Sequence, residues 1–222
     1  MSTDIIVSYD GTPNDDDALA LGKLLAKTGA SLALAYVRHS REFDPRREEL
    51  AQHDAERRLE QGAAWLGNPD IPKHIVVSVS TGEGLEQLAL EEGASVIVFG
   101  SDYRTPPGHA EPGNTAQHLL DGSTVAIAVA AAGLRTASDA TITSIRVASP
   151  DGDTAAQRTA DALAAKFGAS VSADEGDGDL IIVGSQEGLA TGRIALSGWT
   201  RSQLNSVYGS VLVVPHEKPV TL

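Results

Sequence analysis

The chain has 222 residues, of which 41% are hydrophobic and only 4% aromatic, and its formal net charge is −13. This apolar fraction excludes a disordered chain, and an acidic charge without a basic patch disfavours binding to nucleic acid. Cysteine is absent, which excludes disulfide bonds, thiolate metal sites and cysteine nucleophiles.

The N-terminal segment indicates where the protein works. It turns acidic at once, and no apolar run in the chain approaches the roughly 20 residues of a membrane-spanning helix. We therefore expect a cytoplasmic protein without a membrane partner.

Strands and helices alternate through the first half. An apolar run over residues 4–9 precedes a helix expected over residues 15–28, and residues 30–37 resume as a strand. Asp44 and Pro45 predict the start of a long helix that ends near Leu66. Further strands are expected over residues 74–82, 94–100 and 123–131, and helices over 84–93 and 114–120. Right-handed crossovers make this an α/β fold with a doubly wound parallel sheet of five strands.

The last third of the chain repeats pieces of the first in the same order. "KTGASL" at residues 27–32 returns as "KFGASV" at 166–171, and "ASVIVFGS" returns as "GDLIIVGS". These matches predict two related domains, residues 1–134 and 135–222. Between "ASVSA" and "DLIIVGS" the second copy has only "DEGDG". Because a parallel crossover usually needs about a dozen residues, we expect the strand near Val171 to be displaced, short or absent.

Three segments resemble the universal stress protein family: a first strand ending "VSYDG", a second ending "LAYV", and "TGEGLEQLALEEGASVIVFGS". The likeness is to a tandem form whose second copy is truncated and degenerate. It implies an adenine nucleotide alpha hydrolase-like fold with strand order 3-2-1-4-5. It also implies that the closing strands, "VAIAVAA" and "VLVVP", pair within the chain as a pseudo-dimer, and a homodimer of chains is a further arrangement.

Nucleotide-binding members of that family carry G-x2-G-x9-G-[ST] after the fourth strand. The four named positions are filled here by Gly100, Tyr103, Gly113 and Asn114. In the second copy they are filled by Gly184, Glu187, Ser197 and Gly198, so we expect no nucleotide there. The resemblance implies ATP, ADP or AMP in the first copy, with Mg²⁺ or Mn²⁺ if a nucleotide binds.

The expected position of this ligand follows from the fold. Open doubly wound sheets bind small molecules beyond the carboxyl ends of the strands where the strand order reverses, here beside Asp10 and Gly100. Glycine permits close approach of the backbone to phosphate, and the N–H groups of Gly113, Asn114 and Thr115 would face the anion at a helix start. The resemblance assigns ribose or metal contact to Asp10 and adenine contact to the backbone of Val37.

Other features of the same loops disfavour a nucleotide. Tyr103 adds bulk where phosphate is expected to pass unless its ring folds outward, and three prolines, Pro106, Pro107 and Pro112, remove N–H donors. The adjacent carboxylates at residues 15–17 either hold a divalent metal or, as we favour, stabilise a helix N-terminus, because consecutive helical positions point in different directions.

No catalytic set is evident in the sequence, and the six histidines lack the spacing of metal ligands, so no metal site is predicted. Three functions stay open. The favoured one is a stress-response binding or signalling protein gated by an adenine nucleotide. The others are a nucleotide-independent dimerisation scaffold and an adenylyl- or phosphoryl-transfer enzyme, which would need more basic residues at the crevice.

Overall fold

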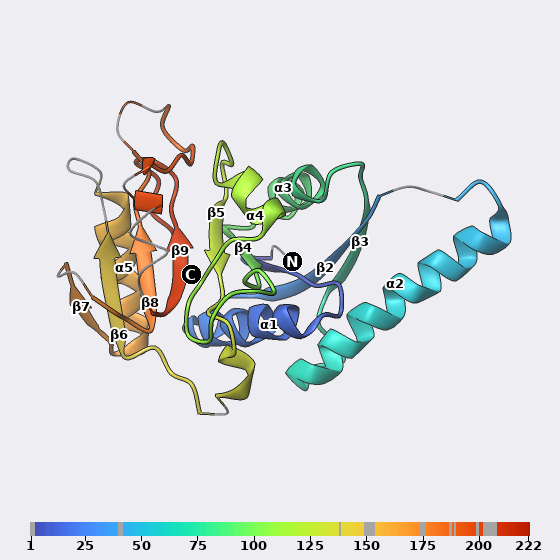
Figure 1. The fold of residues 1–222 in the computed structure, drawn as a ribbon, viewed down its shortest axis with the longest axis horizontal. Coiled ribbons are helices and arrows are strands. Elements are labelled where there is room, and N and C mark those ends of the chain that lie inside the picture. Colours follow the sequence, from blue (N-terminus) through green and yellow to red (C-terminus); the bar gives the residue numbers. More distant parts are fainter. Residues whose placement is uncertain are drawn as a thin grey trace.

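The computed structural model describes residues 3–39, 42–137, 139–148, 154–173, 176–186, 188, 190–198, 200–201 and 208–222. The strands of these residues form one nine-stranded sheet in the order β3-β2-β1-β4-β5-β9-β8-β6-β7, with helices on both faces (Figure 1). The doubly wound α/β architecture predicted from the sequence is therefore confirmed.

The first half contributes the five strands at one side of this sheet. Its elements are β1 (Ile5–Ser8), α1 (Pro13–Leu25), the 3₁₀ helix η1 (Ala26–Thr28), β2 (Leu32–Arg38), α2 (Pro45–Leu66), β3 (Lys73–Val77), α3 (Thr81–Glu92), β4 (Val96–Phe99), α4 (Asn114–Leu119) and β5 (Ala126–Val129). All neighbouring pairs among these strands are parallel, and their order, 3-2-1-4-5, is the predicted one.

Capping side chains set where these helices begin. Asp44 accepts hydrogen bonds from the backbone N–H groups of Arg46 and Arg47, so α2 begins where the sequence predicted. The strand expected over residues 74–82 is shorter, because the Ser80 side chain accepts a hydrogen bond from Glu83 N and caps α3. Residues 81 and 82 therefore belong to the helix.

The second half is a reduced version of the first. Its elements are the 3₁₀ helix η2 (Leu134–Thr136), β6 (Ser144–Ala148), α5 (Ala155–Phe167), β7 (Ser170–Ser172), β8 (Leu180–Val183) and β9 (Ser210–Val213). The order β9-β8-β6-β7 matches β5-β4-β1-β2, and the described residues include no counterpart of β3. The division of the chain at residue 134 stays a prediction.

The strand near Val171 is short, as expected. β7 has three residues and pairs in parallel with β6 at the outer edge of the sheet. The connection from β7 to β8 passes β6 alone, because both strands pair with β6. Arg146 Nη1 on β6 donates to Gly176 O at 2.9 Å and so ties this connection to the sheet.

The two halves meet through their closing strands. β5 and β9 pair antiparallel, with Ile127 opposite Val213 and Val129 opposite Val211, left of the centre of Figure 1. All four side chains are buried. The predicted pairing of the closing strands within one chain is therefore confirmed.

Each face of the sheet has its own core. Val7, Leu34 and Ile182 pack on the side of α1, α2 and α5, whereas Ile6 and Ile97 pack on the side of α3 and α4. The face of the sheet that α3 and α4 cover in the first half is covered in the second half by irregular chain that includes Ile194 and Leu196. None of the described helices combines the length and apolarity needed to cross a bilayer.

Candidate functional site

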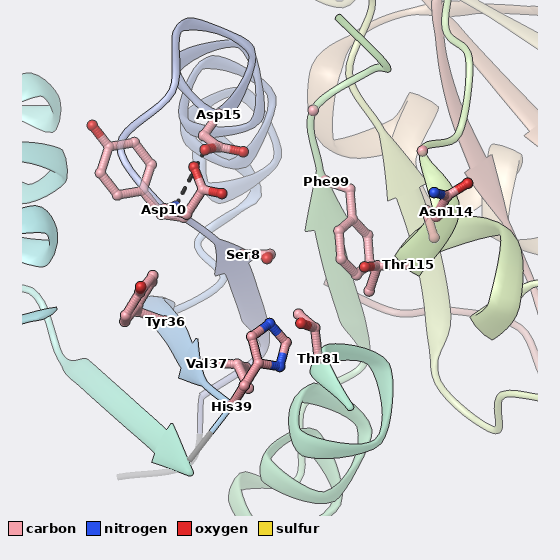
Figure 2. Close-up of a pocket in the computed structure, with 14 residues that line it drawn as sticks. Ser8, Asp10, Asp15, Tyr36, Val37, His39, Thr81, Phe99, Asn114 and Thr115 are labelled. Carbon is pink, nitrogen blue, oxygen red and sulfur yellow. Dashed lines mark hydrogen bonds between the residues drawn. The ribbon is translucent and has the colours of Figure 1, made fainter. Parts of the chain in front are cut away.

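A cavity of about 310 Å³ lies at the carboxyl ends of β1, β2 and β4 (Figure 2). It sits between β1 and β4, where the strand order reverses and where this fold predicts a ligand. Its volume falls in the range of small-molecule pockets, about 300–1,000 Å³. The lining residues are Ser8, Tyr9, Asp10, Asp15, Tyr36, Val37, His39, Thr81, Phe99, Gly100, Gly113, Asn114, Thr115 and Ala116.

Six of the seven candidate site residues lie at this cavity: Asp10, Val37, Gly100, Gly113, Asn114 and Thr115. Tyr103 does not line it. The Tyr103 side chain is 72% exposed, and the Arg104 guanidinium lies over its ring, 4.9 Å from the centroid. The obstruction expected from a tyrosine at this position is therefore absent from the described cavity wall.

Glycine is required at one of the two cavity positions, Gly100, and is not required at the other, Gly113. A Cβ on Gly100 would lie 2.1 Å from the backbone oxygen of Asn14, so glycine is required there by the packing of β4 against α1. A Cβ on Gly113 would meet nothing within 4 Å, and the φ angle of this residue, −69°, suits any side chain. Only the space beside Gly113 is open for a ligand.

The first turn of α4 faces the cavity. Gly113 is its N-cap, and no side chain caps this helix, whereas Thr12, Asp44 and Ser80 cap α1, α2 and α3. The first N–H groups of a helix have no intrahelical partner. Figure 2 shows Asn114 and Thr115 at this end of the cavity, across from Asp10 and Asp15. A ligand that carries acceptor oxygens would find donors here.

The opposite end of the cavity is acidic. The backbone N–H of Asp10 donates to Asp15 Oδ2 at 3.2 Å, and Thr12 donates to the same oxygen from its N–H and its hydroxyl, at 3.1 and 2.7 Å (Figure 2). Burial, together with the neighbouring Asp10 carboxyl, raises the pKa of Asp15 to about 7. When the Asp15 carboxyl group is ionised, this end of the cavity repels other anions.

The three consecutive aspartates point in three directions, as the helical periodicity predicted. Asp15 turns to the cavity, Asp16 accepts a hydrogen bond from the Tyr9 hydroxyl at 3.3 Å, and Asp17 is buried against the second half. Within the described part of the chain, no three His, Cys, Asp or Glu side chains are grouped in a way that suits a metal ion.

Several lining residues were not predicted from the sequence. For Asp15 the favoured interpretation was stabilisation of a helix N-terminus, with a metal site as the alternative, although the spacing Thr12-x-x-Asp15 after β1 indicates a capping turn near the strand end. Tyr36, Thr81 and Phe99 also line the cavity, and each stands at a strand end or a helix start. No local pattern marks His39, which follows β2 directly.

The loop between Gly100 and Gly113 contacts the second half. Gly209 N donates to Gly108 O at 2.8 Å, while Gly108 N donates to Ala132 O of the first half at 2.9 Å. The His109 ring lies 4.1 Å from the Tyr208 ring between centroids. Of the loop's residues, only its two ends reach the cavity wall. The loop is therefore mainly a connection between the two halves.

The corresponding positions of the second half are arranged differently. Ser197 Oγ accepts a hydrogen bond from Thr200 N at 3.1 Å and so caps a turn, and Gly198 is exposed. Glu187 lies outside the described residues.

Comparisons with known proteins agree with the fold. A universal stress protein from Archaeoglobus fulgidus is 15% identical, with 97% of this chain and 99% of that chain covered and a TM-score of 0.58. For a protein of unknown function from Pseudomonas aeruginosa, the identity is 16%, the coverage 97% and 93%, and the TM-score 0.59.

A universal stress family protein from Burkholderia pseudomallei is 28% identical over 44% of this chain and 80% of its own, with a TM-score of 0.37. A comparison with curated proteins found no match. The model of the universal stress protein family matches residues 1–131, which is more than half of the chain. The chain therefore belongs to the universal stress protein family.

Proposed function

We propose that this protein is a stress-response binding protein whose first half takes an adenine nucleotide in the cavity between β1 and β4. The observation that carries the proposal is the convergence of six candidate residues from four separate segments around one cavity. These segments are the end of β1, the end of β2, the end of β4 and the first turn of α4.

The backbone of Val37 is suited to the edge of an adenine ring. Odd-numbered residues of β2 turn their backbone groups toward β1, since Tyr9 N donates to Ala35 O at 2.9 Å. β1 ends at Ser8, so the backbone groups of Val37, two residues further on, face the cavity instead of a strand. A purine edge presents both donors and acceptors, which such a backbone position can match.

The two ends of the cavity suit the other parts of a nucleotide. Ionised carboxylates only accept hydrogen bonds, so Asp10 and Asp15 can accept them from ribose hydroxyls. The uncapped first turn of α4, at Asn114 and Thr115, offers N–H donors to phosphate oxygens. A phosphoryl- or adenylyl-transfer enzyme would need more basic residues at the cavity, and Arg104 and His109, the basic residues of the nearby loop, lie against Tyr103 and Tyr208 instead of lining it. A binding role is therefore favoured over catalysis.

Calorimetric titration tests this proposal. ATP, ADP and AMP are titrated into the protein, each with and without Mg²⁺ or Mn²⁺, and into a Gly113→Arg variant. Arginine at this position fills the open space before α4 without backbone strain, so we expect saturable binding at about one nucleotide per chain, lost in the variant.

Gly198→Arg is the matched control for that experiment, because it adds the same charged side chain at an open, unstrained glycine of the second half. It should bind as the unmodified protein does. Absence of binding for all three nucleotides, under every metal condition, would contradict the proposal.

A nucleotide-independent scaffold is the second candidate. It is favoured by the carboxylates of Asp10 and Asp15 at the cavity, which oppose an anionic ligand, and by the extensive junction through β5 and β9. In that case nucleotides would leave the thermal unfolding temperature of the protein unchanged, and Gly113→Arg would have no effect on its association with partners.

A further inference from the structure

We propose that the cavity selects an adenine nucleoside with at most one phosphate and discriminates against longer phosphate chains. This inference rests on the proposed nucleotide function and specifies its ligand class. It follows from the charge of the cavity wall and from the path of the loop that joins its two sides.

The charge of the wall favours hydroxyl donors over phosphate. Asp10 and Asp15 lie together at one end of the cavity, linked through the backbone N–H of Asp10 (Figure 2). Their oxygens accept hydrogen bonds from ribose hydroxyls, and each added phosphate brings negative charge toward them. The Tyr9 hydroxyl does not offset this charge, because it donates to Asp16.

Nearby cationic side chains are engaged elsewhere. Arg58 of α2 forms an ion pair with Asp54, with Nε and Oδ2 2.9 Å apart, and donates to the backbone oxygen of Asp10. Arg135 pairs with the buried Asp17. Among the described residues that line the cavity, none is Lys or Arg, and His39 is the one side chain there that can become positively charged. The wall therefore offers little compensation for a polyphosphate.

The loop over residues 101–112, which could contact the outer phosphates of a longer chain, is held away from the cavity. Between Gly100 and Gly113, the chain is fixed by Ser101 Oγ, which donates to Ala130 O at 2.6 Å. Further along, Gly108 is bonded to both Ala132 and Gly209. Only the first turn of α4 remains beside the cavity, and the volume of about 310 Å³ is near the lower limit for ligand pockets.

Affinities of adenosine, AMP, ADP and ATP, measured by calorimetry at pH 8 with a chelator of divalent cations, test the inference. This pH lies above the raised pKa of Asp15, about 7, so that the Asp15 carboxyl group is mainly ionised. We expect adenosine or AMP to bind most tightly and ATP to bind roughly tenfold more weakly than AMP, or worse, because of like-charge repulsion.

Two variants separate this explanation from a general effect of acidic residues. Asp15→Asn keeps the capping oxygen and removes the charge, so the ratio of the AMP and ATP affinities should shrink toward one. Asp16→Asn, one residue further along α1 and directed at Tyr9, should leave the ratio unchanged. Thermal unfolding of both variants verifies that they fold.

The outcomes distinguish this inference from the proposed function. ATP binding as tightly as AMP, or an unchanged ratio in Asp15→Asn, would overturn the inference and leave nucleotide binding intact. If none of the four ligands binds, the proposed function itself fails, and the inference fails with it.

Discussion

At the residue scale, the carboxyl group of Asp15 couples the stability of the protein to pH. Burial and the neighbouring Asp10 carboxyl raise its pKa from 3.8 to about 7, so folding favours the protonated form. The stability that this proton provides is fully present below about pH 4 and is lost as the pH rises through 7.

Asp15→Asn removes this dependence. The charged and titratable neighbours of this side chain are Tyr9, Asp10, Asp16 and Arg58 of α2, and all of them remain in the variant. The asparagine side chain itself does not titrate. We expect the unfolding temperature of the variant, relative to the unmodified protein, to rise between pH 5 and pH 8, as measured by circular dichroism. A difference that stays constant with pH would contradict the assignment.

Asp17 has a different structural role from Asp15 and Asp16. It is 1% exposed and accepts hydrogen bonds from Gly133 N at 2.9 Å and Arg135 N at 2.7 Å, so it joins α1 to η2. Asp17→Ala leaves these groups and the Arg135 guanidinium without their partner, and we expect a loss of about 3 kcal/mol in the free energy of unfolding.

Urea unfolding measures that loss, with Asp16→Ala as the control. Asp16 makes one long hydrogen bond, to Tyr9 at 3.3 Å, so its removal should cost less than about 1 kcal/mol. Equal losses in the two variants would show that Asp17 does not anchor the junction.

Gly209 is the most tightly constrained point of the loop contact. Its φ angle is +132°, and a Cβ there would lie 1.8 Å from the backbone oxygen of Gly178. Gly209→Ala should therefore destabilise the protein by about 2 kcal/mol or more, measured by urea unfolding. Gly198→Ala, at an open and unstrained glycine, should change stability little, and comparable losses would argue against the close packing of Gly209 on Gly178.

At the element scale, the loop over residues 101–112 links the cavity to the second half. Tyr208→Ala removes the ring that packs on His109 but keeps the backbone. We expect amide hydrogen exchange at Gly108, whose N–H is bonded to Ala132 O, to become several-fold faster. Tyr103→Ala is the control, since this exposed ring contacts Arg104 in its own loop. Equal exchange in both variants would mean that Tyr208 does not hold the loop.

The order of the elements was predictable from the sequence, whereas this docking was not. Apolar runs, caps such as Asp44 and the repeated segments determine strands, helices and their succession through local chemistry. The contact between Gly108 and Gly209 joins residues far apart in the chain, and no local pattern encodes it. The expected strand over residues 74–82 was too long because the cap at Ser80 competes with strand pairing.

For the candidate site, the residues at strand ends and helix starts were predictable from the sequence, whereas the directions of some side chains were not. Asp10, Val37 and Asn114 follow from the rule that ligands bind at strand ends and helix starts, and they do line the cavity. For Asp15 the helix-stabilising role was favoured over a place at the ligand, because the direction of a side chain in the first turn of a helix depends on the turn before it. The direction of Tyr103 depends on where its loop docks, so its exposed position was not predictable.

At the scale of the whole molecule, one continuous sheet joins a complete half to a reduced one. The pairing of β5 with β9 buries the closing strands of both halves, and Asp17 and Gly209 add contacts on either side of it. The reduced half covers an edge that a single domain would expose and holds the loop that borders the cavity. Because the reduced half covers an edge and holds a loop, whereas the first half contains the cavity, we expect a ligand in the first half alone.

The most direct test of that claim is the change in backbone amide chemical shifts when AMP is added to isotopically labelled protein. We predict saturable changes at Asp10, Val37, Asn114 and Thr115, and little change over β6 and β8. Changes centred on the cavity of about 590 Å³ between the halves, near Gly133 and Asp179, would contradict the account, as would the absence of any saturable change.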